Sequence, residues 1–501
     1  MTSPTRASSS QPTSATCVRR PRACAGHAAY LGVVAQPRVR LADVTDDLTD
    51  DVLTSDQISA LKTTVAGLMP GLRKDLEDLT RIPSVSLDAF DQAHVEASAE
   101  ATAALLRAEG LDVEIVREGG RPAVIGHIDG PEGAPTVMLY AHHDVQPPGD
   151  ELDWESAPFE PTERDGRLYG RGAADDKAGI MAHLAALRAH AGNLPVGVTV
   201  FVEGEEEIGS DSLPTLLEKH GEKLRADAII LADSTNWAIG EPALTTTLRG
   251  LIRVVVTVTT LDHGIHSGMF GGAVPDAITP LIRILATLHD DAGDVAIAGL
   301  KSGTASDLDF DEARLREESG LLDGVEVIGT GSLLDRIWTK PTATVIGIDA
   351  PSVAKSSNTL VPSASAKVSI RLAPDEVPME AYAAVQRHIE ANTPWGAKVE
   401  VHLDDQGAGF DADADGPVYD QARAAFTDAW GVEPVDIGVG GSIPFVASFA
   451  EKFPRAAILV TGVEDPDTRA HGANESLHLG EFEKVCVAEA VLLARLGAMP
   501  R

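Results

Sequence analysis

Residues 136–144 read TVMLYAHHD, a run of apolar residues that ends on two histidines and an aspartate. The apolar run predicts a buried strand, and the polar residues then stand just beyond its carboxyl end. Three further buried runs, at 198–202, 228–231 and 457–460, are also followed by acidic or histidine residues. A helical pattern at 180–190 lies between two of these strands. This alternation predicts an α/β fold with a mainly parallel sheet flanked by helices.

The polar residues beyond these strands are of types that bind metals. Ligands of open α/β sheets bind beyond the carboxyl ends of the strands, so we expect segments that are distant in sequence to meet there. Nitrogen and oxygen ligands without any cysteine are supplied by His142, Asp175, Glu207, Asp233 and His471. This set suits a pair of divalent ions, zinc above all, with manganese or cobalt as alternatives. Glu206 stands beside Glu207 and could handle a proton, so the sequence predicts a two-metal hydrolase.

The composition argues against nucleic-acid binding, a membrane span and export. A net charge of −35 argues against a nucleic-acid partner, which requires a basic face. No stretch of 18 apolar residues exists, so we predict no membrane span. The first 42 residues hold six arginines and no acid, and the stretch after Arg19-Arg20 is too weakly apolar to support export. We therefore expect residues 1–50 to be a disordered extension or the result of a start codon assigned too far upstream. We also expect the protein to be cytoplasmic.

A second kind of unit lies between the early strands and the last one. Residues 251–259 and 367–372 alternate as half-exposed strands, and residues 277–288 and 379–389 have amphipathic helical spacing. Two helices on one face of an antiparallel sheet make an α+β insert. The predicted bounds are 51–244 and 406–501 for a split catalytic domain and 245–405 for the insert.

Five short motifs, in their order along the chain, resemble those of the di-zinc metallopeptidase family. They are AHHD at 141–144, GAADDK at 172–177, EEEIGS at 205–210, ADS at 232–234 and AHG at 470–472. The family includes carnosinase-like dipeptidases, bacterial glutamate carboxypeptidase, acetylornithine deacetylase and succinyl-diaminopimelate desuccinylase. The likeness runs from about Leu79 to His471. It implies two zinc ions per chain, a ferredoxin-like lid at the insert and a homodimer formed through that lid.

The resemblance assigns the metal ligands. It implies one ion on His142 and Asp233, a second ion on Glu207 and His471, and a bridge between the ions through both oxygens of Asp175. It also implies that the peptide bond after Asp175 is cis.

Other residues near the ligands also receive roles from the resemblance. Asp144 would hold the second ring nitrogen of His142. Glu206 would act as the general base and then as the general acid toward the leaving amine. Glu203 and Glu205 match no ligand, and we expect them to be solvated charges.

Four residues are implied to meet the substrate. His266 of the lid would stabilise the oxyanion, and in a lid dimer it would reach the active site of the other subunit. Arg371 would pair with a substrate carboxylate, which suits the planar guanidinium group. Gly441 and Ser442 belong to a GGSIP loop whose backbone would meet the same end of the substrate.

These features favour a hydrolase of dipeptides or small peptides. The EGEEE, GGSIP and SIRL segments are closer to carnosinase-like members than to the biosynthetic deacylases. An N-acyl-amino-acid deacylase with the same metals is the alternative, and a non-catalytic metal-binding protein is a third reading that the base Glu206 argues against. Val439 stands where carnosinase-like members often carry a glutamate, and a histidine expected near residues 406–407 is missing. Recognition of the substrate's amino end therefore stays open.

Overall fold

The computed structural model describes residues 53–441 and 444–500. The extension expected at residues 1–50 lies outside this range, and so does Ser442. Within the described part of the chain, no helix is both long and apolar enough to cross a membrane.

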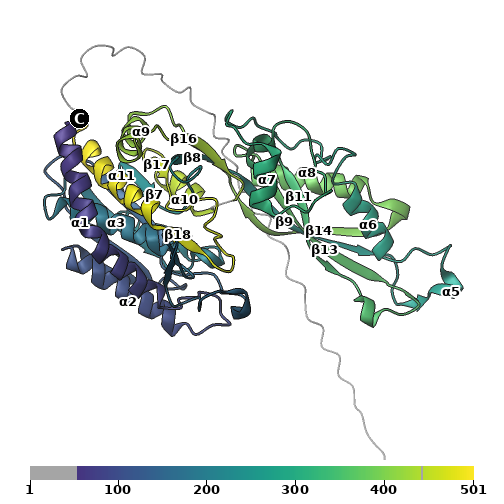
Figure 1. Ribbon diagram of the computed structural model, residues 1–501. Helices are drawn as coiled ribbons and strands as arrows, with labels where there is room; N and C mark the ends of the chain where they lie inside the picture. The colour runs from purple at the N-terminus through teal and green to yellow at the C-terminus, as the bar shows by residue number, and fades with distance from the viewer. Residues whose placement is uncertain (1–52, 442–443, 501) are drawn as a thin grey trace, which may run out of the picture. The chain divides into compact units, whose positions relative to one another are not determined.

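A mixed sheet of nine strands forms the centre of the α/β part (Figure 1). Its order is β1-β2-β6-β3-β7-β17-β8-β15, and β16 also pairs with β8. The bounds are β1 (Asp112–Val116), β2 (Ala123–Ile128), β3 (Thr136–His142), β6 (Gly197–Glu203), β7 (Ala228–Leu231), β8 (Ala243–Leu248), β15 (Phe410–Asp411), β16 (Val435–Val439) and β17 (Ala457–Val460). The inner strands β6, β3, β7 and β17 are parallel, whereas the flanks add antiparallel pairs such as β1–β2 and β15–β8. The predicted α/β class is confirmed, with a parallel centre and antiparallel margins.

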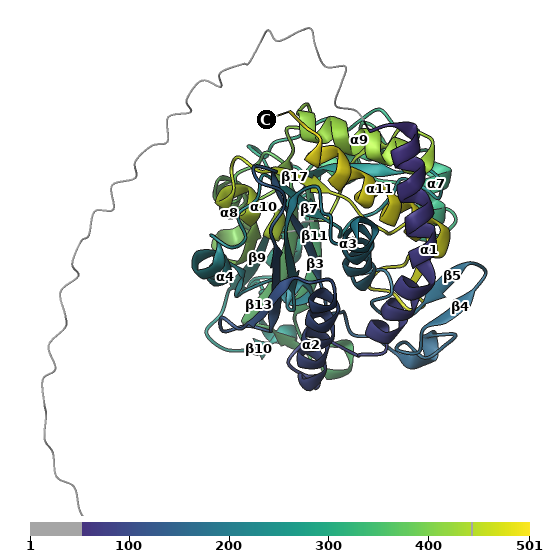
Figure 2. The same ribbon diagram turned by 90° about the vertical axis from the view of Figure 1, so that its left-hand side faces the viewer.

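Helices cover both faces of this sheet (Figure 2). One face carries α1 (Ser55–Thr80), α2 (Ala93–Ala108), α3 (Lys177–His190), α9 (Pro417–Trp430) and α11 (Leu479–Gly497). The other face carries α4 (Leu213–His220) and α10 (Pro444–Lys452). The helix α3 is buried over most of its length because α1 and α11 cover the side that faces away from the sheet. The helix therefore begins in the protein interior, directly after Asp175 and Asp176.

A second, antiparallel sheet forms the insert, with the order β11-β13-β9-β14. Its strands are β9 (Gly250–Thr259), β11 (Thr342–Asp349), β13 (Ser363–Leu372) and β14 (Lys398–Gly407). The helices α6 (Ile278–Ala286) and α8 (Pro378–Ala391) pack into one core with the buried residues of these strands. This βαββαβ succession with its antiparallel sheet is the ferredoxin-like arrangement that was predicted. The chain leaves the central sheet after Leu248 and rejoins it at Phe410.

Short elements complete the fold, and one group of them ties the end of the chain to the centre. A three-stranded sheet joins β4 (Thr162–Arg164) and β5 (Arg167–Tyr169) to β18 (Ser476–His478). The remaining named elements include β10 (Ile265–His266), α5 (Ser267–Phe270), α7 (Glu312–Ser319) and β12 (Thr359–Leu360). Because β18 pairs with β5, the segment after β17 lies beside the loop that leads into α3.

Candidate metal centre

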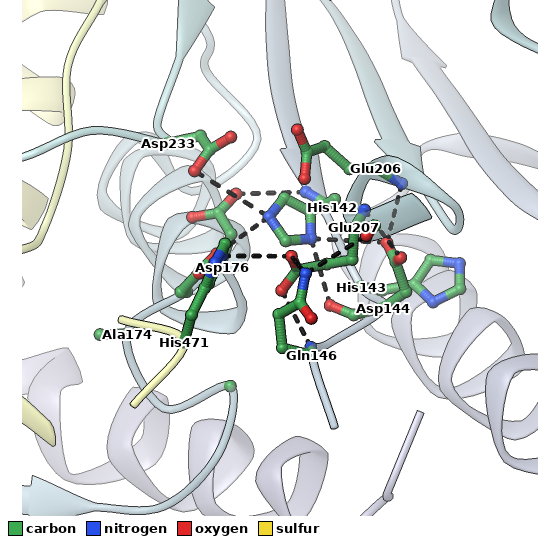
Figure 3. A network of polar contacts seen from close by, with 12 residues as sticks. His142, His143, Asp144, Gln146, Ala174, Asp176, Glu206, Glu207, Asp233 and His471 are labelled. Atoms are coloured by element: carbon green, nitrogen blue, oxygen red, sulfur yellow. Dashed lines mark hydrogen bonds and ion pairs between the residues drawn. The ribbon is translucent and has the colours of Figure 1, made fainter. Parts of the chain in front are cut away.

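The five predicted ligands meet at the carboxyl ends of the central strands (Figure 3). His142 is the last residue of β3, Asp233 follows β7, and Glu207 lies in a 3₁₀ turn after β6. Asp175 lies two residues before the start of α3, and His471 stands in the loop after β17. Parallel strands open toward the same edge, and for this reason residues from distant motifs converge there.

Asp175 is the central residue of the cluster. Its Oδ1 lies 3.1 Å from Nε2 of His142, and its Oδ2 lies 3.1 Å from Nε2 of His471. One carboxylate therefore faces both histidines with different oxygens. The peptide bond between Asp175 and Asp176 is cis, as expected.

The donor atoms fall into two compact groups. His142, Glu206 and Asp233 form the first group, and Asp175, Glu207 and His471 form the second; within each group the donor atoms lie within 4.8 Å of one another. In the second group, Nε2 of His471 is 3.2 Å from Oε2 of Glu207. Each group joins one imidazole nitrogen to carboxylate oxygens, which is the donor chemistry of zinc and similar ions.

The cluster contains several buried carboxylates whose charges would be stabilised by bound cations. Burial and the neighbouring acids raise the pKa of Glu206 well above its usual range, and burial, partly offset by His142, raises the pKa of Asp233 to about 7. Burial, together with Asp175, also raises the pKa of Glu207. Hydrogen bonds from the His471 ring to the carboxylates of Asp175 and Glu207 raise the pKa of His471 to about 11. Carboxylates packed this closely repel one another unless positive charge lies between them, so the residues fit two divalent ions.

The two adjacent glutamates are held in different ways. The carboxylate of Glu207 accepts the backbone N–H of Gln146 at 2.9 Å and its side-chain amide at 2.7 Å. The carboxylate of Glu206 has no hydrogen-bond or ion-pair partner among the described residues. A fixed carboxylate suits a ligand, whereas a carboxylate without a fixed partner suits proton transfer.

Asp144 contacts both His142 at the end of β3 and the turn after β6 that carries Glu206 and Glu207. Its carboxylate accepts the N–H groups of Glu206 at 3.2 Å and Glu207 at 3.1 Å. The ring Nδ1 of His142 is 3.1 Å from the backbone carbonyl of Asp144 and 3.5 Å from its Oδ1. The carbonyl is thus the nearer acceptor of this ring nitrogen, and the carboxylate of Asp144 contacts the same nitrogen at ion-pair distance. His143 points away from the cluster and contacts the carbonyl of Pro122 (Figure 3).

The expectation that Glu203 and Glu205 are solvated is wrong. Glu203 is 0% exposed and accepts the hydroxyl of Tyr140 at 2.9 Å. Glu205 is 3% exposed and accepts the backbone N–H groups of Arg121 and Ser212. Their partners come from other segments of the chain, so the acidic stretch itself gives no sign that it is buried.

Of the residues predicted to meet substrate, none that the structure describes belongs to either ligand group. Arg371 is half-buried on β13, an inner strand of the insert. Burial and then Arg371 lower the pKa of Arg249 to about 10, and Arg249 donates to the carbonyl of Gly440 at 3.0 Å. Gly441 follows β16, but Ser442 lies outside the described residues. His266 is exposed at the start of α5 and accepts the N–H of Gly268.

Four buried or half-buried residues of the site were not predicted. Asp176 accepts the backbone N–H of His142 at 3.1 Å, and Gln146 holds Glu207. Burial, Asp175 and Asp233 raise the pKa of Glu464 well above its usual range. Glu475 binds the loop that carries Asp175. Only Glu475 had a sequence signal, because it ends the AHxxNE segment that contains His471.

Comparison with known proteins identifies relatives over most of the chain. Residues 138–495 match the model of peptidase family M20/M25/M40. The chain is 36% identical over 452 residues to a cysteinylglycine-S-conjugate dipeptidase of Corynebacterium striatum, across 87% of this chain and 99% of that protein. It is 30% identical over 382 residues to a Beta-Ala-His dipeptidase of Rattus norvegicus, across 71% of this chain and 76% of that protein.

A solved structure shares the fold. The di-peptidase Dug1p from Saccharomyces cerevisiae superposes with a TM-score of 0.76 at 24% identity, across 89% of this chain and 100% of that one. The family match covers every residue of both ligand groups, and it also covers the insert that lies in sequence between Asp233 and His471. The chain therefore belongs to peptidase family M20/M25/M40.

Proposed function

We propose that this protein is a dipeptidase that uses two zinc ions to hydrolyse the peptide bond of dipeptides. The observation that carries the proposal is the position of Asp175, whose two oxygens each lie 3.1 Å from a different histidine. The two relatives are both dipeptidases, one acting on cysteinylglycine conjugates and the other on Beta-Ala-His. They favour a dipeptide substrate over the N-acyl-amino acid of the alternative reading.

The metal ligands follow from the two donor groups. His142 and Asp233 would hold one ion, Glu207 and His471 the other, and Asp175 would contact both. When bound, such ions would polarise the scissile carbonyl and lower the pKa of water. Zinc is the proposed metal because each group joins imidazole nitrogen to carboxylate oxygen, and manganese or cobalt is the alternative for the same donors.

Glu206 is the proposed proton carrier. Its carboxylate is close to His142 and Asp233 but is not held by any described hydrogen bond. Burial raises its pKa, which favours a group that can accept a proton from water and later donate it to the leaving amine. Asp144 would keep Glu206 and Glu207 in place through their backbone N–H groups.

Recognition of the substrate's carboxylate is assigned to the insert. Arg371 and Arg249 are close enough to affect each other electrostatically, and Arg249 binds the loop that contains Gly441. A carboxylate between two guanidinium groups would relieve their repulsion and gain charge-assisted hydrogen bonds. The loop residues Gly441 and Ser442 would then contact the same end of the dipeptide.

The insert is also the proposed dimer contact. In this proposal His266 would serve the active site of the partner subunit, where it would stabilise the oxyanion. A cytoplasmic location likewise stays a prediction from the sequence.

A substrate panel tests the proposed activity. The purified protein, supplied with zinc or manganese, would be assayed on cysteinylglycine, β-alanyl-histidine, N-acetyl-amino acids and succinyl-diaminopimelate. We expect the two dipeptides to be cleaved and the acyl compounds to be left intact. Cleavage of the acyl compounds alone would establish the deacylase reading, and cleavage of none would favour a non-catalytic metal-binding protein.

A further inference from the structure

Glu475 lies between the two loops that supply Asp175 and His471. It follows His471 by four positions, and it is 0% exposed. The strand β18 begins at the next residue and pairs with β5, so the N–H of Gly170 donates to the carbonyl of Glu475 at 3.0 Å. This pairing sets the Glu475 side chain at the start of the loop that leads to Asp175.

One oxygen of Glu475 binds this loop at three points. Its Oε1 accepts the backbone N–H of Gly172 at 3.0 Å, of Ala174 at 3.1 Å and of Asp175 at 3.2 Å. Hydrogen bonds to an ionised acceptor are the stronger kind, so three of them fix the path of the loop.

The other oxygen of Glu475 connects to the His471 loop through Arg171. Arg171 donates to Oε2 of Glu475, and its Nη2 donates to the carbonyl of Gly472 at 3.0 Å. Arg171 is 1% exposed, so this ion pair is buried. His471 itself has a φ of 62°, a conformation that residues other than glycine seldom adopt and that surrounding contacts must maintain.

We propose that Arg171 and Glu475 are positioning residues that set the distance between Asp175 and His471. Neither belongs to a ligand group, yet together they bind the backbone on both sides of the second group. Loss of the hydrogen-bonded neighbours of metal ligands typically weakens metal affinity by about 10–100-fold. This inference rests on the proposed two-ion site.

The affinity of the metal-free, full-length chain for Zn²⁺ separates positioning from simple electrostatics. Glu475→Gln removes a negative charge near the ions, so electrostatics alone would already weaken binding. Arg171→Gln removes a positive charge, so electrostatics alone would tighten binding, whereas loss of positioning would weaken it. We expect each variant to lose about ten-fold or more in affinity, measured by competition with a chromophoric chelator. Binding of Zn²⁺ by Arg171→Gln at or above wild-type affinity would overturn the proposal.

A matched variant controls for general destabilisation. Glu489 of α11 is also buried, and its Oε1 lies 2.7 Å from Nδ1 of His183 on α3. Glu489→Gln should lower the unfolding temperature of the metal-free protein but leave Zn²⁺ affinity within about two-fold. An equal loss of Zn²⁺ affinity in this variant would overturn the positioning role.

Two further outcomes keep the test decisive. The double variant Arg171→Gln/Glu475→Gln keeps the net charge of the protein and replaces the ion pair with two amides. It leaves no buried charge without its partner, so it can be used if a single variant fails to fold. It should also bind Zn²⁺ more weakly, and wild-type affinity would contradict the proposal. A wild-type chain that binds no pair of Zn²⁺ ions would instead overturn the proposed function.

Discussion

Nε2 of His471 lies 3.1 Å from Oδ2 of Asp175, although Asp175 precedes α3 and His471 comes only after the insert and β17. The contact exists because β17 pairs with β7, which brings the end of the chain back beside the earlier strands of the central sheet. The candidate metal centre is therefore completed only when the two halves of the split α/β part have joined. The second donor group consequently depends on this contact.

Replacing Asp175 should affect both ions. Asp175→Ala removes the only described carboxylate whose two oxygens face both histidines, so we expect fewer than two Zn²⁺ per chain and a loss of activity of about 100-fold or more. Elemental analysis after gel filtration gives the ion content. The exposed Asp291→Ala is the control and should keep both ions. Two tightly bound ions in Asp175→Ala would contradict a bridging role.

Replacing Glu206 should separate chemistry from metal binding. Glu206→Gln keeps the size of the side chain but cannot accept a proton, so kcat should fall by about 10²–10⁴-fold while two ions stay bound. Glu207→Gln is the contrasting variant, because it should lose ion content as well as rate. Near-wild-type turnover by a two-ion Glu206→Gln protein would remove this residue from proton transfer.

Replacing Arg371 should discriminate between forms of the substrate. Arg371→Lys keeps the charge but loses the planar fork, so kcat/KM for dipeptides with a free carboxylate should fall by about ten-fold or more, the equivalent of one charge-assisted hydrogen bond. Amidated analogues should be affected much less. Similar losses on both kinds of substrate would assign Arg371 a structural role in β13.

The sequence predicts those parts of the site that depend on local patterns. Apolar runs such as 136–141 are visible in the sequence, and the rule that ligands gather beyond parallel strands then brings the five ligands together. The sequence does not predict the antiparallel margins of the sheet, because an apolar run such as β2 does not show the direction of its neighbour and strands as short as β15 carry no periodic signal.

Contacts between distant segments explain the remaining errors. Glu203 and Glu205 lie in a run of acids that reads as solvated, but Tyr140 and the backbone of Arg121 supply their partners from elsewhere in the chain. The contact between Gln146 and Glu207 leaves no mark in either local sequence. Such pairings are set by the tertiary fold and not by spacing.

Away from the metals, the buried pair of His183 and Glu489 should make stability depend on pH. Burial lowers the pKa of His183, but Glu489 and the carbonyl of Tyr140 raise it above its ordinary value on balance. The pair thus stabilises the fold fully below about pH 6.5, and this contribution is lost as the pH rises through the folded-state pKa. Glu489→Gln should therefore cost more unfolding free energy at pH 5.5 than at pH 9. Denaturant unfolding of wild type and variant at both values checks this, and an equal cost at both values would contradict it.

The proposed sharing of His266 between subunits makes a prediction for mixed dimers. His266 is exposed at the start of α5, on an insert whose sheet is separate from the one that ends in the metal ligands. His266→Ala and His142→Ala should each be nearly inactive, the first for lack of oxyanion stabilisation and the second for lack of a ligand. After subunit exchange, half of the dimers would be mixed, and each would carry one intact composite site. Activity should then recover to about a quarter of wild type, because only one of two sites works in half of the dimers. Native mass measurement verifies the exchange, and mixed dimers without recovered activity would place His266 in the site of its own subunit or outside catalysis.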